Sequence, residues 1–208
     1  MIDKICTFLT RKIREEMPEI DDEKAEEINY GLQNVVGEVP KIFIMLGVAY
    51  VLKIFWLALF TFFAIAPYKI SSGGVHLKTH IGCIIFTTGY YCIIPFASQY
   101  FTIPFIVKGI IISVMWIFGM IMIKLYAPAD TENVPILNKQ ERKRKRINSY
   151  ITYTIGLIIA FIIPNETISN ILLLSNFIQT LMITKLAYRL NNSKYGYEVY
   201  GNTSVKNV

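Results

Sequence analysis

The residues best suited to chemistry are His76, His80 and Cys83, which include both histidines of the chain and one of its three cysteines. A cysteine reacts as its thiolate, and an adjacent imidazole is the usual means of forming the thiolate near neutral pH. If a helix begins near Val75, these three side chains fall on one face, with two helical turns between His76 and Cys83. The spacing therefore predicts a nucleophile, Cys83, whose proton His76 takes and later returns to a leaving amine.

Two glycines, Gly73 and Gly74, precede this pair. Paired glycines allow a tight turn and a close approach of backbone N–H groups to a ligand. The N–H groups from Gly73 to Val75 are therefore candidates for holding a developing oxyanion. Glu38 and Asn165 are candidates for orienting the histidine, although no spacing favours either.

Three other interpretations of the same residues stay open. The glycines and histidines could form a reentrant turn at the lipid headgroups, with a cysteine that only packs. His76, His80 and Cys83, at positions i, i+4 and i+7, could instead bind zinc or another transition metal, although no fourth ligand is evident. The chain could also be a small transporter or sensor component without enzymatic activity.

The elements that must position these residues are membrane helices. The chain has 208 residues, of which 53% are apolar, and this content exceeds what one soluble core of that size needs. Its apolar residues form long blocks of the length that a membrane-spanning helix requires. We therefore predict an all-α, polytopic helical integral membrane protein. The blocks cover residues 40–66, 81–96, 103–123, 151–163 and 168–186.

The N-terminal region is amphipathic and lacks a cleavable signal sequence, so we expect no processing there. Residues 2–17 place apolar side chains on one helical face, and a second helix is expected to begin within the acidic segment 19–23. Three parts follow: amphipathic interfacial helices over 1–39, a membrane domain over 40–190 that contains the segment 69–83, and a cytoplasmic tail over 191–208.

Charge indicates the orientation. The net charge is +6, and the basic residues crowd the ends of apolar blocks, a pattern typical of topology signals and anionic lipid contacts rather than of nucleic-acid binding. The loop 98–102 is uncharged, whereas a basic run follows Lys124, so the run and residues 67–80 are expected in the cytoplasm. The block 40–66 complicates this assignment, because it would be about 40 Å long as one helix and would carry Lys53 near its middle. Either this block does not cross simply, or residues 67–80 are partly embedded.

The chain resembles the accessory gene regulator B family of bacterial membrane endopeptidases, which process the precursors of cyclic autoinducing peptides in quorum sensing. The resemblance rests on Gly73-Gly74-Val75-His76 followed by Cys83. Tyr30-Gly31-Leu32-Gln33 and the segment 126–136 before the basic run are also similar to the family. The similarity extends over nearly the whole chain, in order and at suitable spacing.

This resemblance implies that His76 and Cys83 are catalytic in a cysteine endopeptidase that needs neither a metal nor another cofactor. Cys83 would attack the carbonyl before the acidic tail of a short, AgrD-like precursor peptide, and a substrate thiol or hydroxyl would then close a thiolactone or lactone ring. Gly73 and Gly74 would position the substrate or the oxyanion. Lys69 would do the same, in a position where family members often carry arginine.

The resemblance also implies a bacterial cell membrane protein whose active site faces the cytoplasm. Its expected partners are the precursor peptide and an anionic lipid membrane, and a homodimer is left open. The basic run is a topology signal, with contact to the precursor tail or to lipid as a second role. It comprises Arg142, Lys143, Arg144, Lys145 and Arg146.

Overall fold

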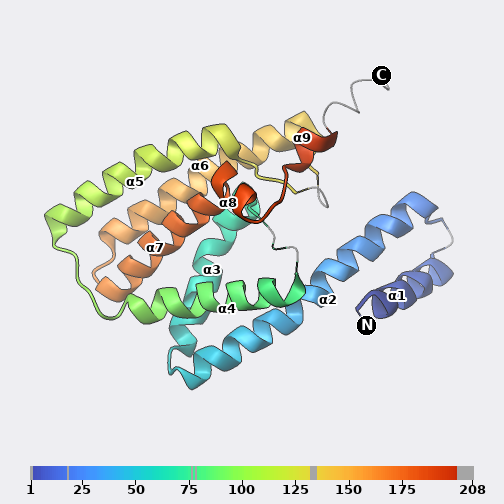
Figure 1. Cartoon of the computed structure of the whole chain (residues 1–208), viewed down its shortest axis with the longest axis horizontal. Helices are drawn as coiled ribbons and strands as arrows, with labels where there is room; N and C mark the ends of the chain where they lie inside the picture. Colours follow the sequence, from blue (N-terminus) through green and yellow to red (C-terminus); the bar gives the residue numbers. More distant parts are fainter. Residues whose placement is uncertain (1, 18, 76, 78, 132–134, 201–208) are drawn as a thin grey trace.

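The computed structural model describes residues 2–17, 19–75, 77, 79–131 and 135–200. Within these ranges there is no β-strand, and an isolated β-bridge joins Gly73 to Ala129. The all-α prediction is confirmed (Figure 1). The helices are α1 (Ile2–Glu16), α2 (Asp22–Val51), α3 (Phe55–Ser72), α4 (His80–Ala97), α5 (Phe105–Tyr126), α6 (Lys139–Ile162), α7 (Glu166–Met182), α8 (Lys185–Leu190) and α9 (Gly196–Tyr200).

Two of these helices, α3 and α5, are long and apolar enough to cross a membrane, and α4 contains a shorter apolar helix. On α5 large apolar side chains are exposed from the first turn to the last, which a water-facing surface would not tolerate but lipid favours. The chain is therefore a helical membrane protein, as predicted. The exposed residues of α5 include Phe105, Ile106, Ile110, Val114, Ile117, Ile121 and Leu125.

Helix α7 contacts α3, α4, α5 and α6 and is the central helix of the bundle (Figure 1). Many of its buried side chains are polar, and three of them donate hydrogen bonds to backbone carbonyls of neighbouring segments, as expected where helices associate in lipid. At one end Asn170 donates hydrogen bonds to the carbonyls of Ser98 and Phe101. At the other end Gln179 donates to the carbonyl of Gly73 at 2.7 Å. Helix α7 thereby links the uncharged 98–102 loop to the glycine turn.

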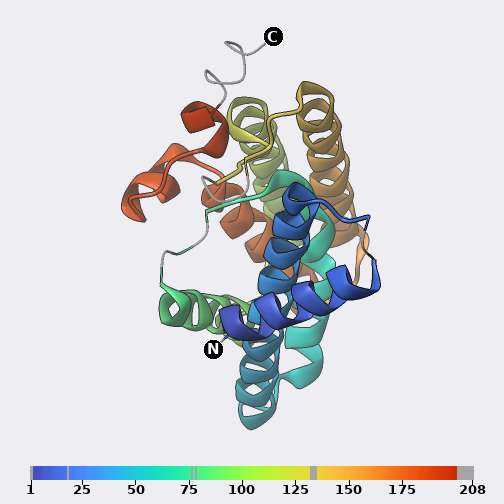
Figure 2. The same ribbon diagram turned by 90° about the vertical axis from the view of Figure 1, so that its right-hand side faces the viewer.

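Helix α1 and the N-terminal half of α2 form an arm that projects from the bundle, and α1 lies across that half of α2 (Figures 1 and 2). Both were predicted, and α2 begins where the acidic segment provides a cap, because the Asp21 side chain accepts a hydrogen bond from the Lys24 N–H. Helix α2 then continues without a break through Pro40 to Val51, so that one helix belongs both to the arm and to the bundle.

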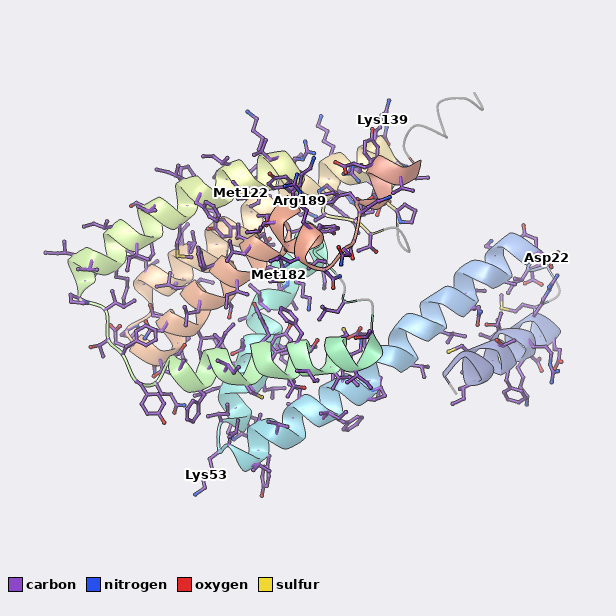
Figure 3. All side chains as sticks on the ribbon, viewed as in Figure 1. Asp22, Lys53, Met122, Lys139, Met182 and Arg189 are labelled. Carbon is purple, nitrogen blue, oxygen red and sulfur yellow. The ribbon has the colours of Figure 1, made fainter. Side chains whose placement is uncertain are left out.

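The apolar block 40–66 does not form one helix. The chain turns at Leu52 and Lys53, and Lys53 has a positive φ of 59°. Its side chain points away from the bundle at the tip of this turn (Figure 3) and is exposed. Lys53 thus has no need of an ion-pair partner in the hydrocarbon layer. Of the two possibilities, the structure favours a block that does not cross simply.

Two sequence-based expectations about helix starts were wrong. The helix expected from Val75 begins at His80, because Thr79 caps it by accepting a hydrogen bond from the Gly82 N–H. The basic run was expected in the loop between the apolar blocks 103–123 and 151–163, but it occupies the first turns of α6, where the Asn138 side chain caps the helix. Long Lys and Arg side chains are good helix formers, which is why a basic segment can extend an apolar helix.

Candidate functional site

Cys83 lies in the first turn of α4 and is a free, partly exposed thiol. The other two cysteines are also free but buried. Cys6 lies within the arm, and Cys92 lies within the bundle, where its Sγ donates to the Met45 carbonyl at 3.7 Å. A reagent or substrate can therefore reach Cys83 more readily than either of the other thiols.

A buried lysine of α2 contacts this thiol. Lys41 Nζ donates a hydrogen bond to Cys83 Sγ at 3.3 Å and another to Glu38 Oε1 at 2.6 Å. The Lys41 side chain is 8% exposed, whereas that of Glu38 is 52% exposed. The contact is possible because α2 packs against α4, and it joins residues from two distant parts of the sequence.

Lys41 carries a positive charge at neutral pH despite its burial. Burial lowers its pKa, but the hydrogen bond and charge of Glu38, together with Cys83, outweigh burial, so the pKa is raised above the ordinary lysine value. Sequence reasoning did not select this residue. The available signal was a lysine at the very start of an apolar block, immediately after Pro40, where a cation must pair or reach water.

Lys69, which was predicted to contact the substrate, lies in the last turn of α3. Its Nζ lies 5.7 Å from the centroid of the Tyr91 ring, a cation–π contact. It is also close enough to interact electrostatically with Glu38, Lys41 and Cys83. The structure thus brings Lys69 and Cys83 into one neighbourhood.

The glycine turn is held between two other segments. Gly74 donates its N–H to the Ala129 carbonyl at 2.9 Å, and the Ala129 N–H in turn donates to the Ser72 carbonyl at 2.7 Å. On the other side the Val75 N–H donates to the Met182 carbonyl at 3.1 Å, at the end of α7 (Met182 is labelled in Figure 3). Segments near residues 73, 129 and 182 therefore fix the backbone that leads to His76.

These contacts also use the N–H groups that were candidates for an oxyanion site. Gly73 donates to the Lys69 carbonyl at 2.9 Å, and the donors of Gly74 and Val75 are engaged as described above. The Gly73 carbonyl accepts from Gln179. An oxyanion role for Gly73 or Gly74 would require at least one of these bonds to open.

Two arginines of the basic run hold the loop that contacts the glycine turn. Arg142 forms an ion pair with the fully buried carboxylate of Asp130 at 3.1 Å and donates to the Pro128 carbonyl at 3.3 Å. Arg146 donates to the Ala127 carbonyl at 2.7 Å. Their inward contacts give these two arginines a structural role that composition alone did not indicate.

The remaining members of the run face outward or pair locally. Lys145 forms an i,i+4 ion pair with Glu141, whereas Lys143 and Arg144 are exposed. A cavity of about 700 Å³ opens beside Lys143 at the start of α6. Basic and tyrosine side chains form much of its lining, including Lys139, Arg142, Lys143, Arg146, Lys185, Tyr126, Tyr150, Tyr195 and Tyr197.

His76 and the side chain of His80 lie outside the described residues, so this geometry includes no distance from either imidazole to Cys83. Helix α4 begins at His80, so the helix that the metal alternative assumed does not extend back to Val75. Among the side chains that are described, no three His, Cys, Asp or Glu residues form a group suited to a metal ion. Asn165 caps the start of α7, at the opposite end of that helix from Met182.

Residues 6–183 match the family model described as Accessory gene regulator B. An AgrB-like protein of Listeria innocua is 27% identical over 184 residues, which cover 86% of this chain and 87% of that protein. Accessory gene regulator protein B of Staphylococcus haemolyticus is 27% identical over 187 residues, covering 90% and 94% of the two chains. The same protein of Staphylococcus aureus is 28% identical over 162 residues, covering 78% and 81%. No solved structure matches the chain. With most of its length matched in order, the chain belongs to the accessory gene regulator B family, whose proteins take part in quorum sensing.

Proposed function

We propose that this chain is a membrane cysteine endopeptidase that removes the C-terminal tail of a short precursor peptide and passes the remaining acyl group to a nucleophile of the same peptide, giving a cyclic autoinducing peptide. The observation that carries the proposal is the position of Cys83. Of the three thiols it is the one that is not buried, it lies in the first turn of a helix, and a cation lies beside its sulfur. Each of these features favours a reactive thiolate.

In the first step Cys83 Sγ attacks the scissile carbonyl carbon. The new bond is a thioester, the C–N bond breaks, and the leaving amine of the tail takes a proton from the His76 imidazolium. The tail departs, and the rest of the precursor stays attached to Cys83.

In the second step a thiol or hydroxyl of the bound peptide attacks the thioester and gives its proton to His76. The ring closes, and Cys83 leaves as a thiolate, so both residues return to their starting states. Exchange of one thioester for another is nearly isoenergetic, which is why a thiolactone product would need no ATP. Water must be excluded until the ring closes, and a site among helices at the membrane edge serves this purpose.

The α2–α3 turn supports a cytoplasmic active site. Because the chain reverses near Lys53, α3 returns toward the side from which α2 enters. The N-terminal arm, the glycine turn and the basic start of α6 then share one side, which the positive-inside rule assigns to the cytoplasm. Precursor peptides are made there, so the scissile bond would reach Cys83 without crossing lipid.

The acidic tail and anionic lipid headgroups are the ligands we propose for the cavity beside α6. Its exposed cations Lys139 and Lys143 can attract carboxylates or phosphates, whereas Lys185 is already paired with Glu198. The tyrosines of the lining suit an interfacial position. Arg142 and Arg146 contribute less to such attraction, since their guanidinium groups already serve the 127–130 loop.

Purified protein in liposomes, supplied with a short AgrD-like precursor peptide, tests the activity. Cys83→Ala and His76→Ala should each abolish release of the tail, measured by mass spectrometry, while Cys6→Ala and Cys92→Ala should retain it. Alkylation should stop the reaction and chelators should not. Cleavage by the Cys83→Ala variant would exclude a cysteine peptidase, and loss of activity with chelators alone would favour a metal site.

A further inference from the structure

We propose that Lys41 is a catalytic residue, whose ammonium is the counter-ion of the Cys83 thiolate before each attack and after each ring closure. This inference deepens the proposed function by adding a second partner for the thiol, supplied by α2. It rests on the contact across the α2–α4 interface and not on the placement of His76.

The geometry is that of a built ion-pair site. The Nζ of Lys41 is within hydrogen-bond distance of both Cys83 Sγ and Glu38 Oε1. The stem of Lys41 is buried, so its ammonium has few alternatives to these two partners. Glu38 is half-exposed and lies one helical turn before Lys41 on α2, so it can hold the ammonium whichever state the sulfur is in.

The charge on Cys83 Sγ changes during the catalytic cycle, and this arrangement balances the charge at each stage. While Cys83 is a thiolate, Lys41 neutralises its charge. When Sγ becomes part of a thioester it loses that charge, and Glu38 remains to pair the ammonium, so no isolated charge is left beneath the acyl group. When the ring closes and Sγ leaves, the negative charge reappears next to a cation already in position, which makes Cys83 a better leaving group.

The role of His76 changes accordingly. If Lys41 stabilises the thiolate, the proton removed from Cys83 can reside on His76 before the substrate arrives. The imidazolium is then ready to protonate the leaving amine of the tail. Lys41 keeps its proton and transfers none, because Glu38 still holds the ammonium while the sulfur is acylated.

The test measures thiol reactivity and needs no peptide substrate. In a Cys6→Ala, Cys92→Ala background, protein in liposomes is treated with a small uncharged alkylating reagent from pH 6 to about 9.5, and modification of Cys83 is followed by mass spectrometry. The variants are Lys41→Met, which removes the charge, and Lys41→Arg, which keeps it. Lys24→Met is the matched control, because Lys24 is an exposed lysine of the same helix.

We expect Lys41→Met to react about tenfold more slowly at pH 7, since an opposite charge at this distance favours the thiolate strongly while a less stabilised thiolate is intrinsically more nucleophilic. The deficit should disappear toward pH 9.5, with the half-maximal rate reached at a higher pH. Lys41→Arg should keep most of the reactivity at pH 7, and Lys24→Met should match the parent.

Two results would overturn the inference. One is an unchanged pH profile in Lys41→Met. The other is a loss of the same factor at every pH, which indicates damage to the fold rather than loss of a counter-ion. Neither bears on the proposed function, which fails if cleavage survives Cys83→Ala; in that case the alkylation profile would still report whether Lys41 and Cys83 form an ion pair.

Discussion

Gly73 lies so close to Ala129 that a β-carbon built on the glycine would be 2.3 Å from the Ala129 carbonyl oxygen, and its φ of +70° is one that other residues rarely adopt. Gly73→Ala should therefore displace the 127–130 loop or the turn itself. Because a displacement of about 1 Å can cost about a hundredfold in rate, we expect release of the tail to fall by about that factor. The assay is cleavage in liposomes at equal protein loading.

Gly47→Ala is the control for this variant. Gly47 lies in α2, and no heavy atom lies within 4 Å of the position that a β-carbon would take there, so alanine should be neutral or slightly stabilising. If Gly73→Ala cleaves the precursor as fast as Gly47→Ala does, the close contact with Ala129 does not position the site.

The basic run should separate into two classes when its members are changed to glutamine one at a time. Arg142→Gln leaves the buried Asp130 carboxylate without its ion-pair partner and should destabilise the protein by about 3 kcal/mol. Arg144→Gln changes an exposed charge and should leave stability unchanged. Thermal unfolding in detergent, followed by tryptophan fluorescence, distinguishes the two. Equal melting temperatures would mean that Arg142 does not stabilise the loop.

For the exposed members Lys143 and Arg144, the expected effect is on substrate attraction. A double change to glutamine should reduce cleavage mildly at low salt and little at high salt, because exposed charges act over a Debye length of about 10 Å at 0.1 M salt. Activity that is unchanged and independent of salt in correctly inserted protein would leave these residues only a topological role.

Close packing of α5 on α6 depends on Gly119. A β-carbon there would lie 2.3 Å from the ring of Tyr153, whose buried hydroxyl donates to the Met115 carbonyl at 2.6 Å. Gly119→Ala should destabilise the bundle by about 1–3 kcal/mol, the usual cost of overpacking. On the same helix, a β-carbon at Gly109 would lie 3.8 Å from its nearest atom, on Phe161, so Gly109→Ala should not destabilise the bundle. The same melting experiment applies, and a Gly119→Ala variant as stable as Gly109→Ala would contradict this packing.

Sidedness can be tested with a membrane-impermeant thiol reagent, because Cys83 is partly exposed and the other cysteines are buried. It should label Cys83 in inside-out vesicles and spare it in intact cells. Thr102→Cys, at an exposed position of the loop after α4, should show the opposite pattern. Labelling of Cys83 only from outside would refute a cytoplasmic site and the proposed route of the substrate.

Much of the helical framework could be predicted from the sequence because block length and amphipathic periodicity are local properties. The amphipathic α1, the start of α2 after Asp21 and the long apolar α5 follow from such patterns. The break at Lys53 could not be predicted in the same way, since no proline or glycine marks it and the turn depends on α2 and α3 packing together.

The site was predictable only in part, for a similar reason. Cys83 stands out by its residue type and by the resemblance of its segment to a family. Lys41, Ala129 and Met182 contact that segment from distant parts of the chain, and pairings of this kind leave no trace in local spacing. The catalytic role of His76 remains a prediction that rests on sequence.

The contacts of the glycine turn also imply an order of events during synthesis. The turn and Cys83 leave the ribosome well before Ala129, Gln179 and Met182, whose groups hold the turn in place. A nascent chain therefore carries its thiol through membrane insertion without the backbone that organises it. Only after α7 has joined the bundle are these contacts complete, so peptidase activity would begin only once this helix has been inserted.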